Sequence, residues 1–150
     1  MPAVSAGRAE RLVVLTLRLL ALTFAVVGIL FIVTPNGVLG RIDDVGNWIG
    51  SFPTAPRSDE KLWLALAFAY MTVITGIALV VSMDVGRYRP FLLVLAAGKA
   101  ASSLAAGAFF VFGTGVFIYL LNFLVDGFLV LLVLGCWVVS APLERAVAPT

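Results

Sequence analysis

The sequence predicts an all-α, polytopic membrane protein, a single domain of residues 1–150 in which four helices cross the membrane as a bundle. The chain is 62% hydrophobic and only 12% charged, whereas soluble domains carry about 25% charged residues. Four apolar runs each reach the length of about 20 residues that is needed to cross a bilayer. These runs cover about residues 12–34, 62–83, 90–112 and 116–139.

The breaks between these runs contain residues that end helices. Pro35 and Gly37 follow the first run, a charged segment from Asp84 to Pro90 separates the second run from the third, and the third and fourth are separated by Gly113-Thr114-Gly115. Proline and glycine clusters of this kind mark turns. Because the last connection is so short, the third and fourth spans must be antiparallel neighbours.

Residues 37–50, between the first two spans, have the pattern of an amphipathic helix. Apolar residues recur at steps of three and four, and polar residues occupy much of the other face. A helix of this kind lies in the plane of the membrane interface, and Asn36 is of the type that N-caps a helix. We interpret this segment as a connector that rests on the membrane. The alternative is a docking surface for a partner outside the cytoplasm, with Trp48, Ile49 and Phe52 as the candidate docking residues.

Basic residues in the loops predict the orientation. More of them lie on the side of the two termini than on the other side, and such an excess marks the cytoplasmic face. The terminal side carries Arg8, Arg11, Arg87, Arg89 and Arg145, and the opposite side carries Arg41, Arg57 and Lys61. We expect both termini in the cytoplasm and the chain in a bacterial inner membrane.

Polar residues in the third and fourth spans form two matching stripes. Lys99 and Asp126 are almost equally far from the turn at Gly113, so at about 1.5 Å rise per residue they lie at the same depth. Charged groups at such depth are costly and are usually paired. The sequence therefore predicts a buried ion pair between Lys99 and Asp126.

Further polar residues are expected beside this pair. Ser103 matches Asn122 in depth, and Gly107 matches Tyr119, with each stripe on one face of its helix. The predicted polar cluster is Lys99, Ser103, Tyr119, Asn122 and Asp126. Arg18, in the first span, either joins this cluster or extends to the membrane surface. Tyr70 is interpreted as a packing residue.

Several kinds of chemistry are excluded by composition. The chain has no His and a single Cys, Cys136, so it offers no histidine ligand or histidine base and no dithiol within one chain. We expect no catalytic residue, no metal site and no cofactor. The net charge of +2 gives no indication of nucleic-acid binding.

The layout resembles a known group of membrane proteins. A first span ending in FIVTPNGVLG, an interfacial helix and three further spans with GRYRP between the second and third are similar in arrangement to the DoxX-like small membrane proteins. That group includes small subunits attached to quinone-linked oxidoreductases, so the resemblance implies an accessory role. It implies no site residue, and it does not account for Lys99.

Three function classes remain. The first, which we favour, is a structural or accessory subunit of a larger membrane complex, such as a bioenergetic one, in contact with the bilayer and with other subunits or further copies of the chain. The second is an oligomeric small transporter or proton-coupled carrier that uses Asp126. The third is an enzyme, or a quinone- or lipid-site protein that holds a carbonyl group with Tyr119, Asn122 and Lys99.

Overall fold

The computed structural model describes residues 2–143, and every regular element within that range is a helix. Four helices are long and two are short. The elements are α1 (Pro2–Val33), α2 (Pro35–Ile49), α3 (Lys61–Met83), α4 (Val85–Tyr88), α5 (Phe91–Phe112) and α6 (Phe117–Val139). The four long helices, α1 from Gly7 onward, are each long and apolar enough to cross a membrane. The predicted all-α fold with four candidate spans is confirmed.

Two helix starts differ from the prediction. α1 begins at Pro2, well before the expected start near residue 12, and α2 begins at Pro35 rather than at residue 37. Proline suits the first turn of a helix because its ring fixes φ and the N–H it lacks would be unpaired there. Thr34 is the N-cap of α2 and makes no side-chain cap bond. The expectation that Asn36 caps this helix is therefore wrong.

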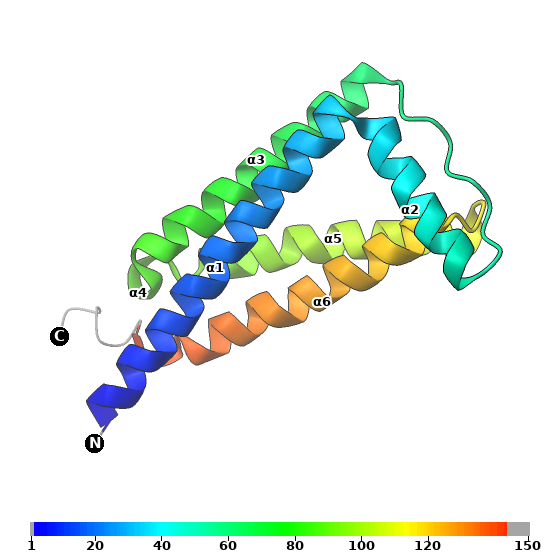
Figure 1. The fold of residues 1–150 in the computed structure, drawn as a ribbon. Coiled ribbons are helices and arrows are strands. Elements are labelled where there is room, and N and C mark those ends of the chain that lie inside the picture. Colours follow the sequence, from blue (N-terminus) through cyan, green and yellow to red (C-terminus); the bar gives the residue numbers. More distant parts are fainter. Residues whose placement is uncertain (1, 144–150) are drawn as a thin grey trace.

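The long helices form two antiparallel hairpins that converge at one end and spread apart at the other (Figure 1). α1 packs along α3, and α5 packs along α6. α4 lies at the converging end, and α2 crosses the open end, from the end of α1 to the turn between α5 and α6 (Figure 1). The bundle is thus a V whose open side is closed by α2.

The hydrophobic core lies in the converging half. Each long helix has at least one completely buried residue there, such as Leu17, Ala78, Leu92 and Val133. Other members of the same cluster follow at steps of three and four along α1, up to Phe24, so one face of that helix points into the core. The four helices share a core only over this half of their length.

Arg89 stabilises the converging end, whereas from the sequence it was counted only as a basic residue of a loop. Its side chain is buried, and its Nε donates to the backbone oxygen of Trp137 at 2.9 Å. The guanidinium also lies over the Trp137 ring, 4.2 Å from the centroid. The last carbonyls of a helix lack partners within the helix and attract positive charge. Arg89 therefore ties the segment before α5 to the end of α6.

At the open end, α2 packs directly against α6. Gly46 is buried, and a Cβ atom at this position would lie 2.7 Å from the Phe117 side chain, so only glycine permits this approach. The Phe52 ring, just after α2, packs against Phe117 with centroids 5.1 Å apart and against Phe110 at 6.5 Å. These contacts hold α2 across the opening between the hairpins.

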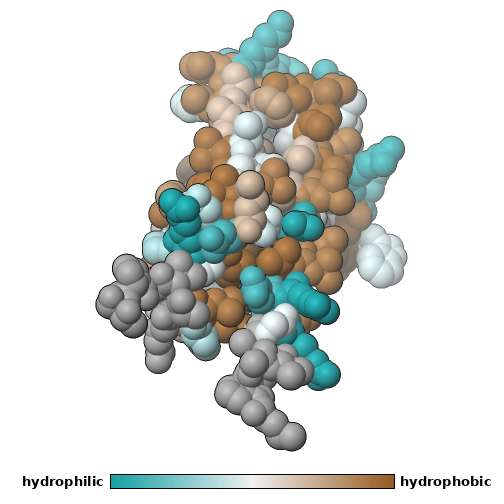
Figure 2. Space-filling view, turned by 90° about the vertical axis from the view of Figure 1, so that its left-hand side faces the viewer, coloured by the Kyte–Doolittle hydropathy of each residue, from teal (hydrophilic) through white to brown (hydrophobic). Residues whose placement is uncertain are grey.

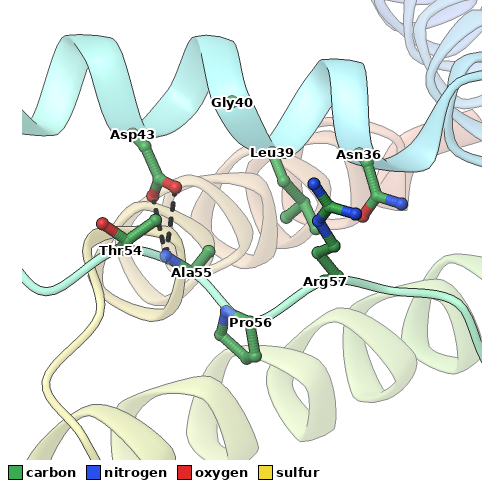
Figure 3. Close-up of a pocket in the computed structure, with 8 residues that line it drawn as sticks. All are labelled: Asn36, Leu39, Gly40, Asp43, Thr54, Ala55, Pro56 and Arg57. Atoms are coloured by element: carbon green, nitrogen blue, oxygen red, sulfur yellow. Dashed lines mark hydrogen bonds between the residues drawn. The ribbon is translucent and has the colours of Figure 1, made fainter.

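The segment that follows α2 is tied back to it by side chains of α2 (Figure 3). The carboxylate of Asp43 accepts the backbone N–H of Ala55, with distances of 3.0 and 3.2 Å to its two oxygens. Asn36, the residue expected to cap α2, donates to Asp59 at 2.8 Å and accepts the N–H of Ser58 at 2.9 Å. The loop from α2 to α3 therefore has a defined path over α2.

The molecular surface has the distribution expected for a membrane protein. Many large hydrophobic side chains of the four long helices are exposed. On the face shown in Figure 2, hydrophobic residues cover most of the upper part, and hydrophilic residues gather mainly in the lower part. The type of membrane and the cytoplasmic side of the termini stay predictions. Arg145, which contributed to the count of basic residues, lies outside the described residues.

Candidate functional site

Lys99 of α5 and Asp126 of α6 form a buried ion pair. The Lys99 Nζ lies 2.9 Å from Asp126 Oδ1, and the two side chains are only 3% and 5% exposed. The short turn between the helices sets their depth: Gly115 adopts φ of 64°, a left-handed conformation that is open to glycine because it has no Cβ. The ion pair predicted from the two polar stripes is confirmed.

The Lys99 ammonium also contacts the other hairpin. It lies 4.7 Å from the centroid of the Phe24 ring of α1 and 5.6 Å from that of Tyr70 of α3. Aromatic faces carry partial negative charge and attract a cation, most strongly where water is excluded. The Lys99 ammonium is therefore contacted by side chains from α1, α3 and α6.

The sequence interpretation missed two members of this site. Tyr70 was interpreted as a packing residue, and Phe24 was not singled out. The sequence indicates these two residues only through their expected depth in the membrane. An aromatic ring at the same depth as a buried charge is a candidate partner for that charge. The Tyr70 hydroxyl is buried and makes no hydrogen bond within the described residues.

Ser102 and Ser103 of α5 each make one hydrogen bond with α6. The Ser103 hydroxyl donates to the backbone oxygen of Phe123 at 2.8 Å. The Nδ2 of Asn122 donates to Ser102 Oγ at 3.2 Å. The polar stripes predicted a pairing of Asn122 with Ser103, but Asn122 is paired with Ser102. Ser103 is buried between the two helices, and Asn122 is only partly buried.

The expected match between Gly107 and Tyr119 also differs in the structure. Gly107 faces Phe123, whose ring would lie 2.9 Å from a Cβ atom at this position. The Tyr119 ring instead packs near Phe109, with centroids 5.7 Å apart. Of the predicted cluster, Lys99, Asp126 and Ser103 are buried together, whereas Tyr119 and Asn122 lie nearer the open end.

Arg18 takes no part in the cluster. Its side chain is exposed on α1. Gly28 packs against Met71, and the two helices run antiparallel, so Arg18 is level with the last turn of α3. At this level the side chain can extend towards the membrane surface. The geometry supports that alternative rather than a place beside Lys99.

The three candidate docking residues in and after α2 differ in their exposure. Trp48 is 87% exposed and Ile49 is 60% exposed, so both are available to lipid or to a partner. Phe52 is partly buried in the aromatic contacts with Phe110 and Phe117. The two α2 residues keep their candidate role, and Phe52 instead holds the loop in place.

Beyond the ion pair, towards the open end, α1, α2, α5 and α6 border a half-open cavity of about 560 Å³. Its apolar wall includes Val27 and Phe31 of α1 and Val38 and Ile42 of α2. On the side of α5 and α6 its wall contains three residues with polar side chains. These are Ser102, Tyr119 and Asn122. Neither member of the ion pair lines the cavity.

Comparison with protein-family models, with curated proteins and with solved structures finds no match to this chain. The likeness to DoxX-like proteins therefore stays a resemblance of layout. The fold and the site define a four-helix protein of membrane-spanning character with a buried, internally neutralised ion pair. The site contains no histidine, and in residues 2–143 no group of three or more His, Cys, Asp or Glu residues could hold a metal ion.

Proposed function

We propose that this protein is a structural or accessory subunit of a larger membrane complex. The observation that carries the proposal is the ion pair of Lys99 and Asp126, which contacts Phe24 and Tyr70 of the opposite hairpin. A charge pair that is buried, internally neutralised and not part of the wall of the cavity is suited to fixing helix positions. It is poorly suited to binding or transferring a substrate.

The residues on the outer side of α5 favour the presence of a protein partner. Three small residues, Ala97, Ala101 and Ala108, are exposed there on one face of the helix, together with the larger Leu104. Small residues allow another helix to approach closely in a membrane, whereas they offer little surface to lipid tails. We therefore expect a helix of the partner to pack along this face of α5.

A proton-coupled carrier is a less suitable function for this geometry. A carrier needs its titrating group to be reached from water during the cycle, because protons must enter and leave it. Asp126 is 4% exposed, bonded to Lys99 and absent from the cavity wall. The accessory role requires no such access.

Purification in a mild detergent at native abundance tests the proposal. We expect a larger membrane protein to co-migrate in fixed stoichiometry with this chain. Ala101→Leu, on the small face of α5, should release that partner, and Ala69→Leu, an equal change on the exposed surface of α3, should leave it bound. A homogeneous homodimer, or a monomer with no stoichiometric partner, would overturn the accessory role.

A further inference from the structure

The helix faces that form the core continue past the ion pair into the cavity wall. On α1 the buried Phe24 is followed by Val27 and Phe31, and on α5 Lys99 is followed by Ser102, at the spacing of a single helix face. Towards the converging end these faces pack against one another. Towards the open end the hairpins diverge (Figure 1), and the same faces border a cavity of about 560 Å³.

Two polar atoms of α6 reach this cavity without a partner. Asn122 uses its amide N–H for Ser102, whereas its amide oxygen and the Tyr119 hydroxyl make no hydrogen bond within residues 2–143. Both residues belong to a helix that is long and apolar enough to cross a membrane. For Asn122, which lies further inside this helix than Tyr119, an unpaired amide oxygen is costly, because the bilayer core holds no water to pair with it.

Tyr119 and Asn122 lie on one face of α6, and both line the cavity. Tyr119 and Asn122 are three residues apart on one helix, a spacing that brings their Cβ atoms to about 5–6 Å. The Tyr119 hydroxyl can donate or accept, and the Asn122 oxygen only accepts. A ligand hydroxyl satisfies both groups, because it donates to Asn122 and accepts from Tyr119.

The charge of the wall indicates an uncharged ligand. Among residues 2–143, no Asp, Glu, Lys or Arg lines the cavity, and the nearby charges of Lys99 and Asp126 neutralise each other. An ionised head group would remain unpaired in this apolar space, at high cost. The volume falls within the range of about 300–1,000 Å³ of small-molecule sites, which are mostly apolar with a few polar groups.

We propose that this cavity binds an uncharged, lipid-soluble molecule that carries a hydroxyl group. The hydroxyl lies between Asn122 and Tyr119, and the apolar body lies against Val27 and Phe31 of α1 and against α2. The molecule enters from the bilayer, since the cavity belongs to the membrane-spanning helices. This site does not depend on the accessory role, because a subunit with or without a partner can hold such a lipid.

Photolabelling of the full-length protein in lipid nanodiscs tests this site. The probe is a long-chain alcohol with a diazirine in its chain, and the labelled peptides are identified by mass spectrometry. We expect saturable labelling of α1 near Val27 and Phe31, removed by an excess of unlabelled alcohol. Asn122→Leu should weaken binding about tenfold, the factor that matches the loss of one hydrogen bond. Asn47→Leu, on the exposed side of α2, should leave binding unchanged.

A second variant tests the cavity without removing a polar group. Ala105 lines the cavity, and Ala108 lies outside it on the same helix. Ala105→Phe places a ring in the cavity and should strongly reduce saturable labelling, whereas Ala108→Phe should retain it. Equal, unsaturable labelling of all four spans would show bulk lipid only and overturn the site. Equal labelling by an alkane probe that lacks the hydroxyl would overturn the polar recognition.

Discussion

The Lys99 ammonium of α5 lies 4.7 Å from the centroid of the Phe24 ring of α1. This contact joins the two hairpins, because Lys99 is also bonded to Asp126 within its own hairpin. It occurs where the hairpins begin to diverge, between the core and the cavity. Side chains of all four long helices therefore meet at the level of the ion pair.

Breaking the ion pair on one side should be far more harmful than removing it entirely. Lys99→Met leaves the Asp126 carboxylate unpaired and should destabilise the protein by about 3–5 kcal/mol, whereas Lys99→Met with Asp126→Leu leaves no unpaired charge and should be much milder. Thermal unfolding in detergent measures both variants. A double variant as unstable as the single one would contradict a structural pair.

The same double variant separates structure from chemistry. If it restores both assembly and cellular function, the pair of Lys99 and Asp126 acts only through helix packing. If assembly returns and cellular function stays lost, one of the two groups has a chemical role, and the carrier or ligand-site alternatives gain support.

The contact between Lys99 and Phe24 should be measurable as a coupling energy. Phe24→Leu keeps an apolar side chain in the core but removes the aromatic face, so its effect should be smaller when Lys99 is already Met. We expect a coupling of about 0.5–2 kcal/mol in a double-mutant cycle. Phe68→Leu, on the exposed part of α3, should show no coupling to Lys99.

Gly46 should tolerate no side chain. A Cβ atom there would lie 2.7 Å from the Phe117 side chain, so Gly46→Ala must push α2 away from α6, with an expected cost of about 1–3 kcal/mol. Gly40→Ala is the matched control, because nothing lies within 4 Å of a Cβ atom at that position. Limited proteolysis of the loop from α2 to α3 should accelerate in the first variant only.

Arg89 should not be replaceable by lysine. The guanidinium both donates to the Trp137 backbone and lies over the Trp137 ring, and the ammonium of lysine cannot reproduce this flat geometry. We expect Arg89→Lys to lower stability by about 1–3 kcal/mol, as measured by thermal unfolding. Arg87→Lys, at an exposed position, should have little effect, and equal losses in both variants would contradict a specific role for Arg89.

The orientation is open to a labelling experiment in which Cys136 is first replaced by Ala. Arg87→Cys, near the converging end, should react only with a reagent added from the cytoplasm, and Glu60→Cys only with one added from the other side. Both positions are exposed. The reverse pattern would show that the excess of basic residues on the terminal side misassigns the cytoplasmic face.

The sequence alone determined the features that depend on local composition and on short connections. The four spans follow from the length of the apolar runs. The pairing of Lys99 with Asp126 follows from the short turn at Gly113, which makes residues equally far from it lie at equal depth. Long side chains then meet even when the rotation of the helices is imperfectly known.

Only the tertiary structure decided the features that depend on how helices rotate and diverge. Successive residues differ by about 100° around a helix, so Asn122 meets Ser102 rather than Ser103, although the two serines have almost the same depth. The divergence of the hairpins depends on contacts between distant segments, such as Gly46 against Phe117. That divergence creates the cavity, and no local pattern in any one span encodes it.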